Sequence, residues 1–236
     1  MSIQGKTVLL TGASRGIGRS IALRLARENV RLALCARDTA ALEKVAAEAK
    51  SAGASAVFVK AFDLAEERAI VDFVRSSSDA VGPADVLINN AGFNPRKAPV
   101  AEVTTEEFDG IVAVNLRAPF ILLREVLRAM ILRRTGHIVN ILSTVCHYAN
   151  ESMGAYTAAK RGLEGLAGVL LKEARPQGVR VSAVYPGGTD TTFRAVRRPD
   201  YMSPDSVAEA VYAVLTLPED LTVHSMTFRP WVETNF

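Results

Sequence analysis

The sequence predicts an α/β fold of three layers, in which helices cover both faces of a doubly wound, seven-stranded parallel sheet. Short runs rich in Val, Ile and Leu alternate along the chain with longer amphipathic segments. The short runs are apolar almost throughout, which is typical of strands buried on both faces of a parallel sheet. Strands that alternate with helices indicate βαβ units. Because no repeat, low-complexity tract or linker divides the chain, we expect one domain over residues 1–236.

The apolar runs are the expected strands, and the amphipathic segments are the expected helices. Strands are predicted at Thr7–Thr11, Arg31–Ala36, Ala56–Phe62, Val86–Asn89, His137–Leu142, Arg180–Val184 and Val223–Phe228. Helices are predicted at Arg19–Glu28, Thr39–Ala52, Ala65–Asp79, Thr105–Arg133, Ala155–Arg175 and Pro204–Leu217. Asp38 precedes the second helix as a polar cap, and Ser203 followed by Pro204 marks the start of the last one.

The composition argues against several classes of protein. With 28 basic and 25 acidic residues, the net charge of +3 is too small to indicate a nucleic-acid-binding surface. No stretch is long and apolar enough to span a membrane, and the first residues lack the apolar region of a signal peptide. The two cysteines form no disulfide framework, and no cluster has the spacing of metal ligands. We expect a cytoplasmic protein without a metal, a membrane or a nucleic acid as partner.

A glycine-rich turn joins the first expected strand to the first expected helix. It reads GASRGIG over residues 12–18, with glycines at Gly12, Gly16 and Gly18. Glycines allow a tight turn and a close approach of the backbone to a pyrophosphate, while the helix N-terminus offers unpaired N–H groups to the anion. We interpret the turn as a dinucleotide-binding loop. For this motif alone, the alternative is a turn that only packs the helix on the strand.

The end of the second expected strand favours NADP(H) over NAD(H). Dinucleotide-binding folds place an Asp or Glu near this point to hold a ribose 2′-hydroxyl, whereas an Arg accommodates a 2′-phosphate. This sequence has Ala36 there, followed by Arg37, and Arg15 lies inside the glycine-rich turn. Two guanidinium groups suit a phosphate, because they are permanently charged and bind it through paired hydrogen bonds. Asp38 is interpreted as the helix cap.

Tyr156 and Lys160 are four residues apart in the fifth expected helix, so they lie on one helical face. A cation near a phenol lowers the phenol pKa from its usual value of about 10, which prepares the group for proton transfer near neutral pH. A surface Tyr and Lys on a helix is the alternative, and it is the commoner case for this pair alone.

Together, the motifs resemble those of the short-chain dehydrogenase/reductase family, in its single-domain branch, across nearly the whole chain. Order and spacing agree for TGASRGIG at residues 11–18, Asp63-Leu64, Asn89-Asn90-Ala91-Gly92, Asn115, Ser143, Tyr156 with Lys160, and Pro186-Gly187. The resemblance implies a Rossmann fold and an NADP(H)-dependent enzyme that transfers hydride between the nicotinamide and a carbonyl or secondary alcohol.

The resemblance also implies four catalytic residues. Tyr156 would protonate the carbonyl oxygen of the substrate, and Ser143 would donate a hydrogen bond to the same oxygen. Lys160 would bind the nicotinamide ribose and lower the pKa of the Tyr. Asn115 would hold a water that connects Lys160 to solvent.

The same resemblance indicates where the cofactor binds. Asp63 would accept from the adenine amino group, the turn at Asn89–Gly92 would border the adenosine ribose and the nicotinamide side, and the residues after Pro186 would line the nicotinamide. With the glycine-rich turn and Arg37, the expected cofactor-binding residues are Gly12, Ser14, Arg15, Gly16, Ile17, Gly18, Arg37, Asp63, Leu64, Asn89, Ala91, Gly92, Tyr156, Lys160, Pro186, Gly187, Thr189 and Thr191.

The sequence leaves the substrate open. Ligands bind beyond the carboxyl ends of the strands in such sheets, so we expect the segment at about 188–203 to cover the site as a substrate loop. Its arginines, Arg194, Arg197 and Arg198, either attract an anionic substrate, steady the cofactor phosphates or remain solvated. We expect a moderate preference for carbonyl substrates that carry a carboxylate or a phosphate. A 3-oxoacyl reductase of carrier-protein or coenzyme A thioesters is an alternative, although the glycine-rich ending usual there is missing. A non-catalytic dinucleotide sensor is another, which the intact catalytic positions disfavour.

We also expect a homotetramer or a homodimer. The segments Thr105–Arg133 and Ala155–Arg175 carry more apolar residues than one sheet face can cover, and related proteins pair these helices between subunits. The expected partners are therefore a small carbonyl or hydroxy compound and further copies of this chain.

Overall fold

Seven parallel strands form one sheet in the order β3-β2-β1-β4-β5-β6-β7 in the computed structural model, which describes residues 2–193 and 196–234. The strands are β1 (Thr7–Thr11), β2 (Arg31–Ala36), β3 (Ala56–Ala61), β4 (Val86–Asn89), β5 (Gly136–Ile141), β6 (Val179–Pro186) and β7 (Ser225–Phe228). The order reverses at β1, which pairs with both β2 and β4, as a doubly wound sheet requires. The predicted fold class is confirmed, and the ends of some strands shift by one or two residues.

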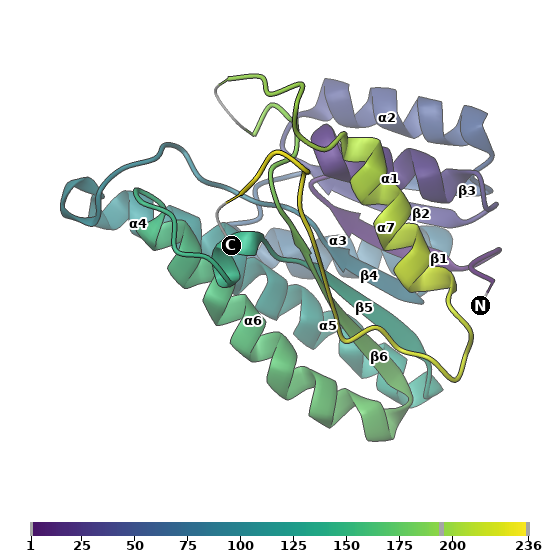
Figure 1. Cartoon of the computed structure of the whole chain (residues 1–236). Coiled ribbons are helices and arrows are strands. Elements are labelled where there is room, and N and C mark those ends of the chain that lie inside the picture. The colour runs from purple at the N-terminus through teal and green to yellow at the C-terminus, as the bar shows by residue number, and fades with distance from the viewer. Residues whose placement is uncertain (1, 194–195, 235–236) are drawn as a thin grey trace.

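Helices cover both faces of the sheet (Figure 1). On one face lie α1 (Gly16–Ala26), α2 (Thr39–Ala52) and α7 (Pro204–Thr216). On the other lie α3 (Glu67–Val81), α5 (Ala118–Arg133) and α6 (Gly154–Ala174). The expected helix Thr105–Arg133 is continuous, but it consists of α4 (Thr105–Val112), a π-helical turn (Ala113–Arg117) and α5. Among the described helices, none is long and apolar enough to cross a membrane.

The strands are apolar throughout because each of them contributes to two cores. Neighbouring residues on a strand point to opposite faces of the sheet. Leu10 of β1 packs with Ile21 on the α1 and α7 side, whereas Leu9 packs with Ile70 and Ile121 on the α3 and α5 side. All five residues of β1 are buried, as expected for a strand in the middle of a parallel sheet.

Polar caps begin the helices where the sequence has short oxygen-bearing side chains. Asp38 Oδ1 accepts from the Ala41 N–H at 3.0 Å, and Ser203 Oγ accepts from Ser206 N–H at 3.1 Å, so both predicted caps are confirmed. Thr104 caps α4 in a full capping box, because Glu107 bonds back to the Thr104 N–H. This capping box was not predicted from the sequence, and it fixes the Glu107 carboxylate at the first turn of α4.

A buried histidine lies in β5. His137 Nε2 is 2.8 Å from Ser182 Oγ, and that hydroxyl donates its own hydrogen to the Val223 carbonyl at 2.6 Å. Ser182 must therefore accept from His137, so Nε2 carries the proton of the neutral ring. Burial, with the nearby charge of Arg180 as a smaller cause, lowers the pKa of His137 from 6.5 to about 4.

We predict that His137 makes the fold less stable in mild acid. The unfolded chain takes up a proton near pH 6.5 and the folded chain only near pH 4, so the unfolded state binds more protons as the pH falls between these values. From pH 7 to pH 5 this linkage lowers the free energy of unfolding by about 2 kcal/mol. In urea unfolding, the free energy lost between pH 7 and pH 5 should be smaller by about 2 kcal/mol in His137→Gln than in the wild-type protein. The same substitution at His224, which is exposed, should leave the loss as in wild type. Equal losses in all three proteins would contradict the prediction.

Candidate active site

The loops that follow the strands carry the expected site residues to one edge of the sheet. Because all seven strands are parallel, their carboxyl ends lie at the same edge, where ligands bind in open α/β sheets. The glycine-rich turn follows β1, the run Asn89–Gly92 begins at the end of β4, Ser143 follows β5, and Pro186 ends β6. Of these strands, β1 and β4 are direct neighbours at the point where the strand order reverses.

The glycine-rich turn has the backbone geometry of an anion-binding loop. Gly12 and Gly16 have positive φ angles of 68° and 54°, which side chains other than glycine rarely adopt. A Cβ at Gly18 would overlap the Gly12 carbonyl oxygen, so the close approach of α1 to the turn requires glycine there. The first turn of α1 contains no acidic residue, and the exposed Arg15 is its N-cap. The positive end of this helix therefore faces the carboxyl edge uncompensated.

Asn90 ties this turn to the neighbouring strand end, a role that the sequence analysis missed. Its Nδ2 donates to the carbonyls of Thr11 and Gly12 at 2.8 and 3.2 Å. In return Thr11 Oγ1 accepts from the N–H groups of Asn90 and Ala91 at 3.1 and 3.0 Å. The position of Asn90 at the end of β4, beside β1, was the available signal. These four bonds fix two of the expected cofactor segments to each other.

Arg37 and Asp63 lie at the ends of the next two strands. The Ala13 N–H donates to the Cys35 carbonyl at 3.1 Å, which places the glycine-rich turn beside the end of β2 and the exposed Arg37. Within residues 2–193 and 196–234, neither Arg15 nor Arg37 forms an ion pair. Asp63, beyond β3, is exposed, and its Oδ1 accepts from the Ala65 N–H at 2.9 Å. The outer part of the edge thus carries two cationic groups without a carboxylate partner.

Lys160 is buried beneath Tyr156 on α6. Its Nζ donates to the Ile141 carbonyl at 2.9 Å and lies 5.8 Å from the centre of the Tyr156 ring. Burial lowers the pKa of Lys160 from 10.5 to about 8. An ammonium has three N–H donors, and the described part of the chain supplies one acceptor. The group is therefore suited to oxygen acceptors on a ligand.

Ser143 follows β5 at the same edge of the sheet. Ser143 lies two residues after Ile141, whose carbonyl accepts from the Lys160 ammonium. This bond therefore links α6 to the strand that leads to the Ser143 hydroxyl. Ser143 Oγ accepts from the Val145 N–H at 3.3 Å and caps a short 3-10 turn that packs against α6. A hydroxyl that accepts from the backbone keeps its hydrogen available for another acceptor.

Asn115 lies fully buried in the π-helical turn between α4 and α5. Its Nδ2 donates to the carbonyls of Phe93 and Ile111 at 2.7 and 2.8 Å, and its Oδ1 accepts from the Phe93 N–H at 3.2 Å. Both N–H groups of the amide are thereby used, so Oδ1 is the atom of this side chain left for a water. The main contact in the structure is with the loop after β4, which Asn115 fixes against the helices.

The segment after β6 is held by the C-terminal part of the chain, which the sequence analysis did not anticipate. The Gly188 N–H donates to Glu233 Oε1 at 3.2 Å, and Glu233 Oε2 is 3.0 Å from Arg229 Nε. The Arg229 guanidinium in turn lies 4.6 Å from the centre of the Tyr148 ring, in the segment after Ser143. The C-terminal residues thus connect two of the loops that form the site.

The expected substrate loop lies across the strand ends. A Cβ at Gly16 would be 3.3 Å from Thr191 Cγ2, and the Phe193 ring lies 5.9 Å from the Tyr156 ring. Two of the three loop arginines pair with carboxylates of the same loop, Arg197 with Asp190 and Arg198 with Asp200, each at 2.7 Å. Arg194, the third, lies outside the described residues. These two arginines are therefore compensated by their own loop, which argues against the preference for anionic substrates expected from the sequence.

Comparison with known proteins agrees with this geometry. Residues 6–202 match the protein family described as short chain dehydrogenase. Gluconate 5-dehydrogenase of Gluconobacter oxydans is 34% identical over 197 residues, which cover 83% of this chain and 76% of that enzyme.

Two solved structures are similar over nearly the full length. An alcohol dehydrogenase from the archaeon Thermococcus sibiricus, complexed with 5-hydroxy-NADP, has a TM-score of 0.91 and 31% identity, covering 98% of this chain and 99% of that one. A metagenomic short-chain oxidoreductase in complex with NADP has a TM-score of 0.88 and 36% identity, covering 99% and 100%. The protein is an oxidoreductase that belongs to the short-chain dehydrogenase family.

Proposed function

We propose that the protein is an NADP(H)-dependent oxidoreductase that transfers hydride between the nicotinamide and a carbonyl or secondary alcohol substrate. The observation that carries this proposal is the buried Lys160 ammonium, one helical turn from Tyr156 and bonded to the strand that leads to Ser143. A phenol beside a cation can transfer a proton near neutral pH. The complexes of the two structural relatives with NADP and 5-hydroxy-NADP support the cofactor. In this proposal residues 1–236 act as one domain, with the substrate loop at about 188–203.

The residues present fit such a dinucleotide. The glycine-rich turn, with positive φ at Gly12 and Gly16, leads into the N-terminus of α1, which suits a pyrophosphate, and the Lys160 ammonium has donors for ribose hydroxyls. Arg15 and Arg37 would hold a 2′-phosphate, and Asp63 would accept from the adenine. When bound, the cofactor supplies or takes up the hydride.

The side chains of the site divide the proton transfer between them. Tyr156 donates its hydroxyl proton to the substrate oxygen in reduction and accepts it in oxidation. Ser143 donates a hydrogen bond to the same oxygen and holds the carbonyl in place. Lys160 is mostly cationic below its pKa of about 8, and it lowers the pKa of the neighbouring phenol. Asn115 is a positioning residue, because it fixes Phe93 in the loop beside Tyr156.

We predict that Tyr156→Phe lowers kcat by about 100-fold or more and leaves NADPH binding almost unchanged. The ring keeps its packing, and only the proton donor is lost, which is typically a loss of 10²–10⁴ in rate. Steady-state kinetics and fluorescence titration with NADPH measure the two effects. Tyr212→Phe, on α7 beneath Arg24, is the matched control and should keep wild-type kinetics. A Tyr156→Phe variant that retains more than a few per cent of kcat would rule out this proton donor.

We predict a preference for NADPH over NADH that depends on Arg37. Removal of one charged contact to a phosphate costs about 1.4 kcal/mol or more, so Arg37→Ala should raise the KM for NADPH at least about tenfold and leave the KM for NADH unchanged. Arg27→Ala removes an exposed arginine at the far end of α1 and should have no effect. Equal use of both cofactors by the wild-type protein would refute the preference.

We further propose that the chain forms a homotetramer or homodimer through α5 and α6. Phe120 on α5 and Val169 on α6 keep 45% and 56% of their surface exposed. On α6, Gly165 and Gly168 are exposed, and a Cβ at either would meet no atom within 4 Å. Exposed apolar residues beside such open backbone favour close helix packing with another copy.

Light scattering at micromolar concentration should therefore give a mass of at least twice the 25.4 kDa of one chain. Val169→Glu should shift the mass toward the monomer, because a buried unpaired carboxylate is costly in an interface. Val71→Glu places the same charge on α3, at a residue that is 37% exposed, and should leave the mass unchanged. A wild-type mass of one chain would argue against the assembly.

A further inference from the structure

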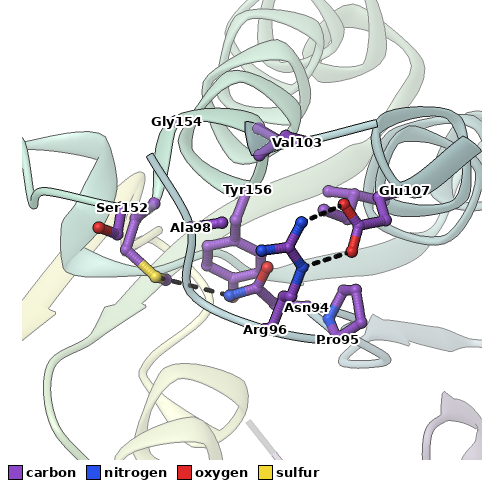
Figure 2. Close-up of a pocket in the computed structure, with 12 residues that line it drawn as sticks. Asn94, Pro95, Arg96, Ala98, Val103, Glu107, Ser152, Gly154 and Tyr156 are labelled. Carbon is purple, nitrogen blue, oxygen red and sulfur yellow. Dashed lines mark hydrogen bonds and ion pairs between the residues drawn. The ribbon is translucent and has the colours of Figure 1, made fainter. Parts of the chain in front are cut away.

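A pocket beside Tyr156 is lined by the loop after β4, by α4 and by the start of α6 (Figure 2). Apolar side chains such as Val103 and Met153 form much of its wall. Of its lining residues in the described chain, only Arg96 and Glu107 carry a full charge. The ionic character of this pocket therefore depends on how these two groups are arranged.

Arg96 and Glu107 form a two-pronged ion pair at the pocket, drawn as two dashed lines in Figure 2. Arg96 Nε is 2.6 Å from Glu107 Oε1, and Nη2 is 2.9 Å from Oε2. Arg96 Nη2 also donates to the Glu102 carbonyl at 2.6 Å. Glu107 is held in turn, because its Oε2 accepts from the Thr104 N–H at 3.0 Å in the capping box of α4. A carboxylate fixed by the fold thus occupies the forked face of the guanidinium.

This arrangement disfavours a carboxylate on the substrate. The forked geometry that binds a carboxylate best is already used within the chain. The Arg96 and Glu107 side chains keep 45% and 26% of their surface exposed, and a second carboxylate here would be attracted by Arg96, repelled by Glu107 and left without an unpaired cation as partner. A neutral oxygen meets neither penalty. It can accept from Arg96 Nη1, which points away from Glu107 in Figure 2, or from the amide of Asn94.

The substrate loop shows the same pairing. Arg197 and Arg198 are each bonded to an aspartate of that loop, so neither of them offers a free cation to replace Arg96.

We propose that Glu107 determines substrate specificity, because it neutralises Arg96 and so makes the pocket select neutral carbonyl compounds over those that carry a carboxylate. This inference rests on the proposed function, since it concerns the compound that Tyr156 protonates. Specificity requires repulsion of competing compounds as well as attraction of the substrate. Here the Glu107 carboxylate repels compounds that carry a carboxylate.

The test compares a 4-keto acid with its primary amide, which have the same reacting ketone and the same number of non-hydrogen atoms. NADPH oxidation gives kcat/KM for each compound. The wild-type protein should prefer the amide by about tenfold or more. Glu107→Gln, which keeps an oxygen acceptor for the Thr104 N–H, should raise the acid-to-amide ratio by about tenfold or more, because Arg96 then carries an unpaired charge.

Two further variants separate this effect from a general change of charge. Glu106→Gln makes the same change at an exposed neighbour that does not line the pocket, and it should alter the ratio by less than about twofold. The double variant Arg96→Gln/Glu107→Gln should return the ratio to that of wild type, since no charged group remains in the pocket.

The outcomes separate this inference from the proposed function. A wild type that prefers the acid, or a Glu107→Gln ratio equal to that of wild type, overturns the inference while the oxidoreductase activity stands. A wild type that reduces neither these compounds nor any of a panel of small ketones and aldehydes with NADPH contradicts the proposed function and this inference with it. If Glu107→Gln does not fold, the test is the salt dependence of the acid-to-amide ratio of the wild-type protein. An acid-to-amide ratio that is constant from about 0.05 to 0.5 M salt supports a compensated pocket, and a ratio that falls with salt indicates a free cation and overturns it.

Discussion

The buried ammonium of Lys160 is the interaction on which the rest of the site depends. Removing a cation from water is costly, and one bond to the Ile141 carbonyl offsets part of that cost, which is why the pKa falls to about 8. Its neighbours on the buried face of α6, Ala159 and Leu163, are apolar and offer no further acceptor. The group therefore favours an oxygen-rich ligand at the strand ends, provided that α6 stays fixed against β5.

Bonds between the loops provide that rigidity. Asn90 joins the turn after β1 to the end of β4, Asn115 joins the loop after β4 to the helices, and Glu233 joins the segment after β6 to the C-terminal residues. Each bond links parts of the chain that are 22 or more residues apart, so the segments after β1, β4 and β6 cannot move without breaking one of these bonds. A side chain held by such partners keeps the geometry that the proposed proton transfer would need. The parallel strands bring the loops to one edge of the sheet, and these polar bonds fix the loops relative to one another.

The sequence predicted the sheet well, because an apolar run buried on both faces identifies a parallel strand on its own. It predicted which residues follow the strand ends, including Arg37 and Ser143, for the same reason. It could not predict the partners of those residues. Gly188 and Glu233 are 45 residues apart, and nothing local marks them as a pair. The π-helical turn at Ala113–Arg117 was also missed, since it alters the hydrogen bonding of a helix and not its apolar pattern.

Arginines with and without a carboxylate partner lie at different parts of the carboxyl edge of the sheet. Arg15 and Arg37, near the ends of β1 and β2, have no carboxylate partner among the described residues, whereas Arg96, which lines the pocket beside Tyr156, has one. Pairing an arginine with a carboxylate of the same chain removes its long-range attraction for anions but keeps its hydrogen-bond donors. An anionic ligand is therefore drawn to the β1 and β2 side and a neutral one is accommodated beside Tyr156. In the proposed function, this difference would favour the phosphate-bearing end of the cofactor near β1 and β2.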